Sequence, residues 1–116
     1  MAVIAVIAAI AILGVLLGAC QHNEVSRALG ARCDVSAECD ERCLAPSLDY
    51  PGGFCTIACN ARGECPSGTT CADHEGGVCL FECASDADCA FLGAGWPCSA
   101  ADLRGGGIKV MVCRGT

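Results

Sequence analysis

The chain has few of the residues from which a hydrophobic core is usually built. Its aromatic residues are one Trp, one Tyr and three Phe among 116 residues. Much of the 53% apolar content lies at the start, where residues 2–19 contain only Ala, Val, Ile, Leu and Gly. Fifteen glycines add backbone freedom that folding must remove. We therefore expect the remaining chain to need covalent cross-links more than a large core.

Charge is absent before Cys20, and positive charge is sparse after it. All thirteen acidic and all seven basic residues follow Cys20, so that region carries the whole net charge of −6. The acids are scattered and no run of basic residues occurs, which argues against binding to nucleic acid phosphates. We expect a soluble, mildly acidic surface and no nucleic-acid partner.

Motifs of the common catalytic sites are missing. The sequence contains no G-x-S-x-G, no H-E-x-x-H and no phosphate loop. His74 stands between two acids, but no nucleophile accompanies it, and we expect a solvated turn residue. The chain is predicted not to be an enzyme and to carry no cofactor.

Metal sites are not indicated either. Structural zinc favours C-x2-C pairs, which are absent, and the only histidines are His22 and His74. Asp86-Ala87-Asp88 offers two carboxylates, but the glycine and the late glutamate of a calcium loop are missing. We expect no metal site, and calcium-dependent adhesion through Asp86 and Asp88 is retained only as an alternative function.

The uncharged start of the chain ends in Leu17-Gly18-Ala19-Cys20, which resembles the lipobox of bacterial lipoprotein signals. That family has an aliphatic residue three positions before the cysteine and small residues directly before it. The resemblance implies that residues 1–19 are a signal peptide forming an apolar helix. Cys20 is then the mature N-terminus and carries the acyl chains, such as palmitate, that anchor the protein in the membrane.

The resemblance also implies a location. The family's sorting rule retains lipoproteins with Asp after the cysteine in the inner membrane, and Gln21 occupies this place here. The outer membrane of a Gram-negative cell is therefore expected, with residues 20–32 as a lipidated tether. An uncleaved membrane-spanning anchor and an ordinary secretory signal stay open, because ~20 apolar residues can also span a bilayer.

Of the thirteen cysteines, the twelve after Cys20 form a repeating pattern. They divide into three units of four, at residues 33–55, 59–79 and 83–113. Each unit opens with C-x5-C, has an acid before its second cysteine and has a Gly-Gly pair near its last one. An even number predicts disulfides and leaves Cys20 for the lipid. The predicted disulfide cysteines are Cys33, Cys39, Cys43, Cys55, Cys59, Cys65, Cys71, Cys79, Cys83, Cys89, Cys98 and Cys113.

Four cysteines allow three pairings, and the spacing alone does not choose among them. The units resemble EGF-like and related secreted modules, and this resemblance implies that the first cysteine pairs with the third and the second with the fourth. Each bridge would contribute about 3 kcal/mol by loop entropy. The implied bridges are Cys33–Cys43, Cys39–Cys55, Cys59–Cys71, Cys65–Cys79, Cys83–Cys98 and Cys89–Cys113.

Glycines placed before short apolar segments predict turns followed by strands. We expect a small disulfide-rich fold of three tandem units, each a two-stranded β-hairpin with turns, joined end to end. Residues 99–102 resemble a capping box and are expected to begin one helical turn. The predicted strands are residues 54–57, 78–81 and 108–113.

The whole pattern resembles tandem cysteine-rich repeats of Gram-negative surface lipoproteins. This implies a non-enzymatic, lipid-anchored module that binds an unidentified protein or glycan, or has a structural role at the cell surface. Protease inhibition is an alternative, with residues 61–63 and 103–105 as exposed reactive strands around Arg62 and Arg104.

Aromatic residues with recognition potential are Tyr50, Phe91 and Trp96, although some of them are expected to cover disulfides. The long loops at residues 90–97 and 99–107 are where a partner surface is expected, because loops on a rigid scaffold carry function.

Overall fold

The computed structural model describes residues 25–115, except for the side chain of Arg62. The predicted signal peptide and the predicted lipid site at Cys20 lie outside the described residues. None of the helices between residues 25 and 115 has the length and apolar character that crossing a bilayer requires.

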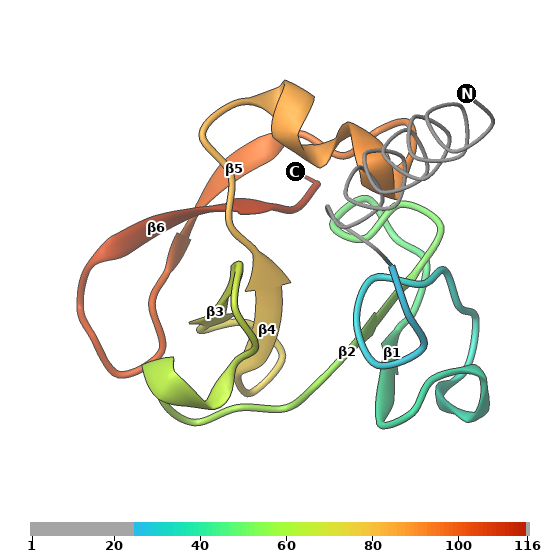
Figure 1. Ribbon diagram of the computed structural model, residues 1–116, viewed down its shortest axis with the longest axis horizontal. Helices are drawn as coiled ribbons and strands as arrows, with labels where there is room; N and C mark the ends of the chain where they lie inside the picture. Colours follow the sequence, from blue (N-terminus) through green and yellow to red (C-terminus); the bar gives the residue numbers. More distant parts are fainter. Residues whose placement is uncertain (1–24, 116) are drawn as a thin grey trace, which may run out of the picture.

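Three antiparallel hairpins of two strands each follow one another along the chain, and a 3-10 helix precedes each of them (Figure 1). The elements are η1 (Ser36–Glu38), β1 (Arg42–Leu44), β2 (Phe54–Thr56), η2 (Arg62–Glu64), β3 (Thr69–Ala72), β4 (Val78–Phe81), η3 (Asp86–Leu92), β5 (Cys98–Asp102) and β6 (Lys109–Cys113). The prediction of a small disulfide-rich fold of short hairpins and turns is confirmed for these residues.

Six disulfides join the cysteines in the predicted pairing. The Cα atoms of the two cysteines in each bridge are between 5.3 and 6.0 Å apart, within the normal range for disulfides. In each hairpin the third and fourth cysteines stand opposite each other on the two strands, so the two bridges tie both strands to the chain before the hairpin. The bridges are Cys33–Cys43, Cys39–Cys55, Cys59–Cys71, Cys65–Cys79, Cys83–Cys98 and Cys89–Cys113.

The acid before the second cysteine of each unit caps the 3-10 helix that contains it. Glu38 Oε1 accepts hydrogen bonds from the backbone amides of Asp34 and Val35, at 2.8 and 3.2 Å. Glu64 and Asp88 accept the amide four positions before them in the same way. The repeated acid therefore closes the C-x5-C segment on itself before the hairpin begins.

In the first two hairpins, the glycine directly before the second strand allows two segments of the chain to cross closely. Gly53 and Gly77 have φ of +83° and +104°, in the region that favours glycine. A Cβ at Gly53 would overlap the carbonyl oxygen of Cys33, and one at Gly77 would overlap that of Cys59. The first cysteine of the unit thus passes directly over the glycine, where no side chain fits.

Residues 99–102 belong to strand β5, so the predicted helical turn is wrong. Asp102 stands opposite Lys109 in the hairpin, and Lys109 Nζ lies 2.7 Å from Asp102 Oδ1. Ser99 Oγ donates to the carbonyl of Arg114 at 2.9 Å, which removes it from any capping role. Pairing with β6 therefore outweighs the local capping preference of this segment.

The three hairpins follow one another along the chain as expected, and they also share one core. In Figure 1 the β3–β4 hairpin lies between the other two, and β4 contacts both β2 and β6. Phe54, Leu80 and Val112, one from each hairpin, are 0% exposed and belong to the same cluster. A packed core therefore adds to the disulfides in holding the units together.

The linkers between units take part in this packing. The amide of Cys79 donates to the carbonyl of Ile57 at 3.1 Å, and Glu82 forms an isolated antiparallel bridge with Val112. Trp96 Nε1 of the third unit donates to the carbonyl of Pro51 in the first, at 3.0 Å. Linkers of three residues are too short to separate the hairpins, and each one bonds to the hairpin that follows it.

Candidate functional site

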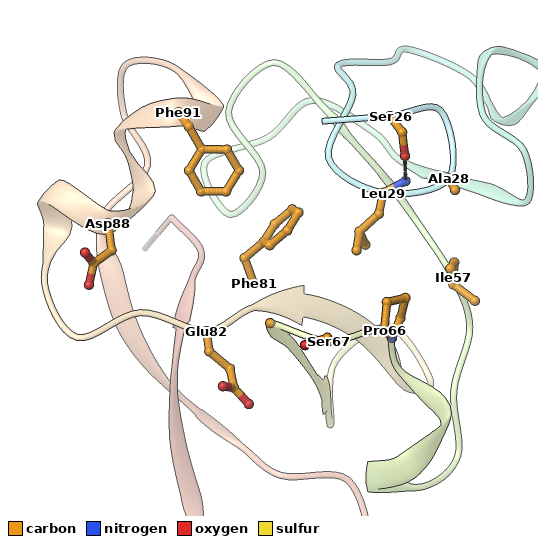
Figure 2. A pocket seen from close by; sticks show the side chains of 11 residues that line it. Ser26, Ala28, Leu29, Ile57, Pro66, Ser67, Phe81, Glu82, Asp88 and Phe91 are labelled. Atoms are coloured by element: carbon orange, nitrogen blue, oxygen red, sulfur yellow. Dashed lines mark hydrogen bonds between the residues drawn. The ribbon is translucent and has the colours of Figure 1, made fainter. Parts of the chain in front are cut away.

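A groove of about 580 Å³ opens where the N-terminal segment meets the second and third units (Figure 2). We call it the aromatic groove. Its volume lies in the range of small-molecule and side-chain binding sites. Its lining residues are Ser26, Ala28, Leu29, Ile57, Pro66, Ser67, Gly68, Phe81, Glu82, Asp88 and Phe91.

Two phenyl rings form the centre of the aromatic groove. Phe81 and Phe91 meet edge to face, with ring centroids 4.9 Å apart and an interplanar angle of 87°. Both are half-buried, and Phe81 also packs edge to face on Phe54 of the core. Because one ring rests on a fully buried residue, the pair is held in place before any ligand arrives.

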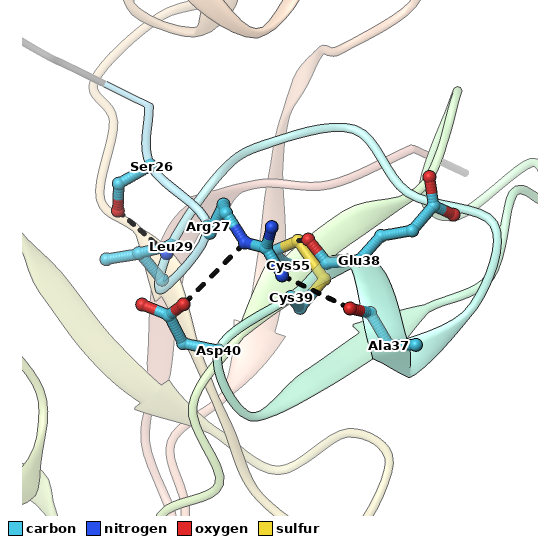
Figure 3. Close-up of polar contacts among 8 residues, drawn as sticks. All are labelled: Ser26, Arg27, Leu29, Ala37, Glu38, Cys39, Asp40 and Cys55. Atoms are coloured by element: carbon cyan, nitrogen blue, oxygen red, sulfur yellow. Dashed lines mark hydrogen bonds and ion pairs between the residues drawn. A yellow bond between two sulfur atoms is a disulfide. The ribbon is translucent and has the colours of Figure 1, made fainter.

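The N-terminal segment forms one rim of the aromatic groove and is bonded to the first unit. Ser26 and Leu29 exchange backbone hydrogen bonds, and the Leu29 amide also donates to Ser26 Oγ at 3.1 Å. Arg27 Nε lies 3.8 Å from Asp40 Oδ1, and its Nη2 donates to the carbonyl of Ala37 at 3.1 Å (Figure 3). From Ser26 onward, the segment predicted as a tether therefore contacts the folded units.

The rim also carries two exposed carboxylates, Glu82 and Asp88. Asp88 Oδ2 accepts the amides of Ala84 and Ser85, which orients its side chain and leaves Oδ1 without a bond among the described residues. No basic side chain is among the eleven residues that line the groove. The groove therefore combines an apolar wall with a negatively charged edge.

The residues considered for metal binding have structural roles. Asp86 Oδ1 accepts the amide of Cys98 at 2.8 Å, and Asp88 caps η3. Three cysteine sulfurs in each unit lie within 4.8 Å of one another, as in the set Cys33, Cys39 and Cys43. These sulfurs belong to adjacent disulfides, and a disulfide sulfur is not the thiolate that binds a metal.

The segments proposed as reactive strands of an inhibitor differ in conformation and exposure from what was expected at three residues. Arg62 begins the 3-10 helix η2, so its backbone is not extended. Leu103 is 5% exposed, which makes the expected exposure wrong at this residue. Arg104 donates its amide to the carbonyl of Cys71, and its Nη1 lies 2.7 Å from Asp73 Oδ1.

Of the three aromatic residues singled out in the sequence, one reaches the groove. Tyr50 and Trp96 are 4% and 5% exposed and belong to the core, and burial raises the pKa of Tyr50. Phe91 lines the groove, but it belongs to η3, so the loop predicted at residues 90–97 begins only after Leu92. His74 lies in the β3–β4 turn as expected, but it is half-buried, and this burial lowers its pKa.

Sequence reasoning did not identify Leu29, Phe81 and Glu82 as groove residues. Phe81 and Glu82 could have been found from one signal, because an aromatic residue and an acid stand together in the three-residue linker between Cys79 and Cys83. No protein-family model, curated protein or solved structure matches the chain.

Proposed function

We propose that this protein is a non-enzymatic binding module anchored by lipid on Cys20 at the outer membrane, outside the cytoplasm. The observation that supports this most directly is the completeness of the disulfide set. All twelve cysteines from Cys33 to Cys113 are paired with one another, so none of them is available to Cys20. Six disulfides in a small chain are typical of proteins in an oxidising compartment.

We propose the aromatic groove as the ligand-binding surface of this module. Most of its wall belongs to the disulfide-bonded part of the chain, and the N-terminal rim is hydrogen-bonded to it, so little conformational freedom is lost when a ligand binds. Ser26, at its rim, is six residues after Cys20, and six extended residues span at most about 20 Å. A groove this close to a lipid anchor favours a partner that is itself at the membrane surface.

The anchor is tested by intact mass measurement of the protein isolated from membranes of a Gram-negative host. We expect a chain that begins at Cys20, carries diacylglycerol and an amide-linked acyl chain, and gains two hydrogens for each of six bridges on reduction. The matched variant Cys20→Ser should keep the six bridges but remain uncut and without lipid.

Two results would contradict this function. One is a mature protein in which Cys20 is bonded to another cysteine, because the disulfide set would then differ from the one described. The other is a mature protein in which the Cys20 thiol carries no lipid, because the attachment to the membrane would then have another cause.

A further inference from the structure

We infer that the aromatic groove binds a positively charged segment of a partner protein, with one Arg or Lys side chain entering the groove and apolar residues beside it. This inference rests on the proposed binding function and names the chemistry of its ligand. It follows from three features of the groove, which are the two rings, the apolar wall opposite them and the acids at the edge.

The first feature is the pair of rings. In Figure 2 the rings of Phe81 and Phe91 lie next to each other between Asp88 and Leu29. Aromatic faces attract cations, and the attraction grows when the cation is partly removed from water, as it is in a groove. Neutral aliphatic ligands gain nothing from this ring geometry beyond apolar contact.

The second feature is the apolar surface around the rings. Leu29, Ile57 and Pro66 line the groove together with Phe81 and Phe91. The aliphatic stem of Arg or Lys covers such surface while its charged end stays near polar groups. One basic side chain can therefore contact the apolar wall and the acidic edge at the same time.

The third feature is negative charge that no ion pair among the described side chains neutralises. Five ion pairs occur among the described side chains, and their acids are Asp40, Glu75, Asp73, Asp102 and Asp49. Glu82 and Asp88 are not among them, and the groove lining contains no base. Two exposed carboxylates at the edge of the groove attract a cation and repel anionic ligands.

The test uses the full-length protein in non-ionic detergent and two synthetic peptides with blocked ends. One peptide alternates leucine with arginine, and the other has neutral citrulline in place of each arginine. We expect the arginine peptide to bind at least about tenfold more tightly by calorimetry, and its affinity to fall as salt is added. Ring-proton shifts of Phe81 and Phe91 in NMR spectra should locate the binding.

Variants distinguish binding at the groove from a general attraction of the peptide to the negatively charged protein. Glu82→Gln should weaken the arginine peptide about fivefold, and Phe91→Leu should weaken it about as much. The control is Glu41→Gln, which removes one negative charge from an exposed position just before β1, outside the groove, and should change affinity less than about twofold. All variants should retain six bridges by mass.

Several outcomes would overturn the inference. These are equal affinities for the two peptides, equal effects of Glu82→Gln and Glu41→Gln, or no binding of the arginine peptide. A neutral oligosaccharide such as chitohexaose that binds, is weakened by Phe91→Leu and is unaffected by Glu82→Gln would also overturn it, while leaving a glycan-binding module. The mass measurement alone tests the lipid on Cys20. A negative result with the peptides would therefore leave the proposed lipid anchor standing.

Discussion

Glycine at the position before β4 determines whether the chain can cross itself at the start of the second unit. Gly77 has φ of +104°, and a Cβ at this position would overlap the carbonyl oxygen of Cys59. Gly77→Ala therefore combines backbone strain with a steric conflict against rigid backbone. We expect it to lower the free energy of unfolding by about 3 kcal/mol, measured by chemical denaturation with the disulfides intact.

The neighbouring glycine is a matched control. Gly76 has φ of +83°, but nothing lies within 4 Å of a Cβ added there. Gly76→Ala carries only the strain of the left-handed region, about 1 kcal/mol. Equal losses in the two variants would show that the crossing over Cys59 is not what requires glycine at residue 77.

At the scale of elements, the 3-10 helices depend on the acids that cap them. Hydrogen bonds from the amides of Asp34 and Val35 lower the pKa of Glu38 below its usual value of 4.5. A carboxylate with a lowered folded-state pKa stabilises the fold above the unfolded pKa, and this contribution is lost as the pH falls through the folded pKa.

Glu38→Gln should therefore lower the melting temperature by a few degrees at neutral pH. The difference from the unsubstituted protein should shrink as the pH falls below 4.5 and disappear below the lowered pKa of Glu38. Calorimetric melting curves across the acid range measure this. Glu41→Gln removes the same charge without a backbone contact and should follow the unsubstituted protein; a melting difference for Glu38→Gln that is independent of pH would contradict the capping role.

At the scale of the whole molecule, a shared core makes the three units unfold together. Leu80 is 0% exposed at the centre of the core, so Leu80→Ala should cost about 3 kcal/mol. Trp96 lies in the third unit and packs on Phe54 of the first, with ring centroids 5.4 Å apart. Its fluorescence should therefore change at the same denaturant concentration as the far-ultraviolet circular dichroism of all three hairpins.

The control at this scale is a leucine of the same size outside the core. Leu48 is 83% exposed, and Leu48→Ala should change the stability by less than about 0.5 kcal/mol. Two separate transitions for the fluorescence and circular dichroism signals would indicate independent units and contradict the shared core.

Local patterns in the sequence were sufficient to predict much of this fold. The C-x5-C spacing with its acid, the glycine pairs and the resemblance to EGF-like modules led to the six bridges and to strand β4 at its observed residues. Each of these features acts over a short stretch of chain, where turn geometry and ring closure dominate. The helical turn at residues 99–102 failed because its partner strand β6 decides its conformation, and a capping pattern carries no information about that partner.

Sequence by itself determined the local units of this protein, because cysteine spacing and glycine act within each unit. Only the tertiary structure decided how the units meet, since Phe54, Leu80 and Val112 come together from three separate hairpins. The aromatic groove likewise depends on tertiary packing, because it forms where Phe81 and Phe91 come into contact and Ser26 of the N-terminal segment lies at the rim. Contacts between residues far apart in the chain depend on the final packing, and that packing is set by the best joint burial of all three units.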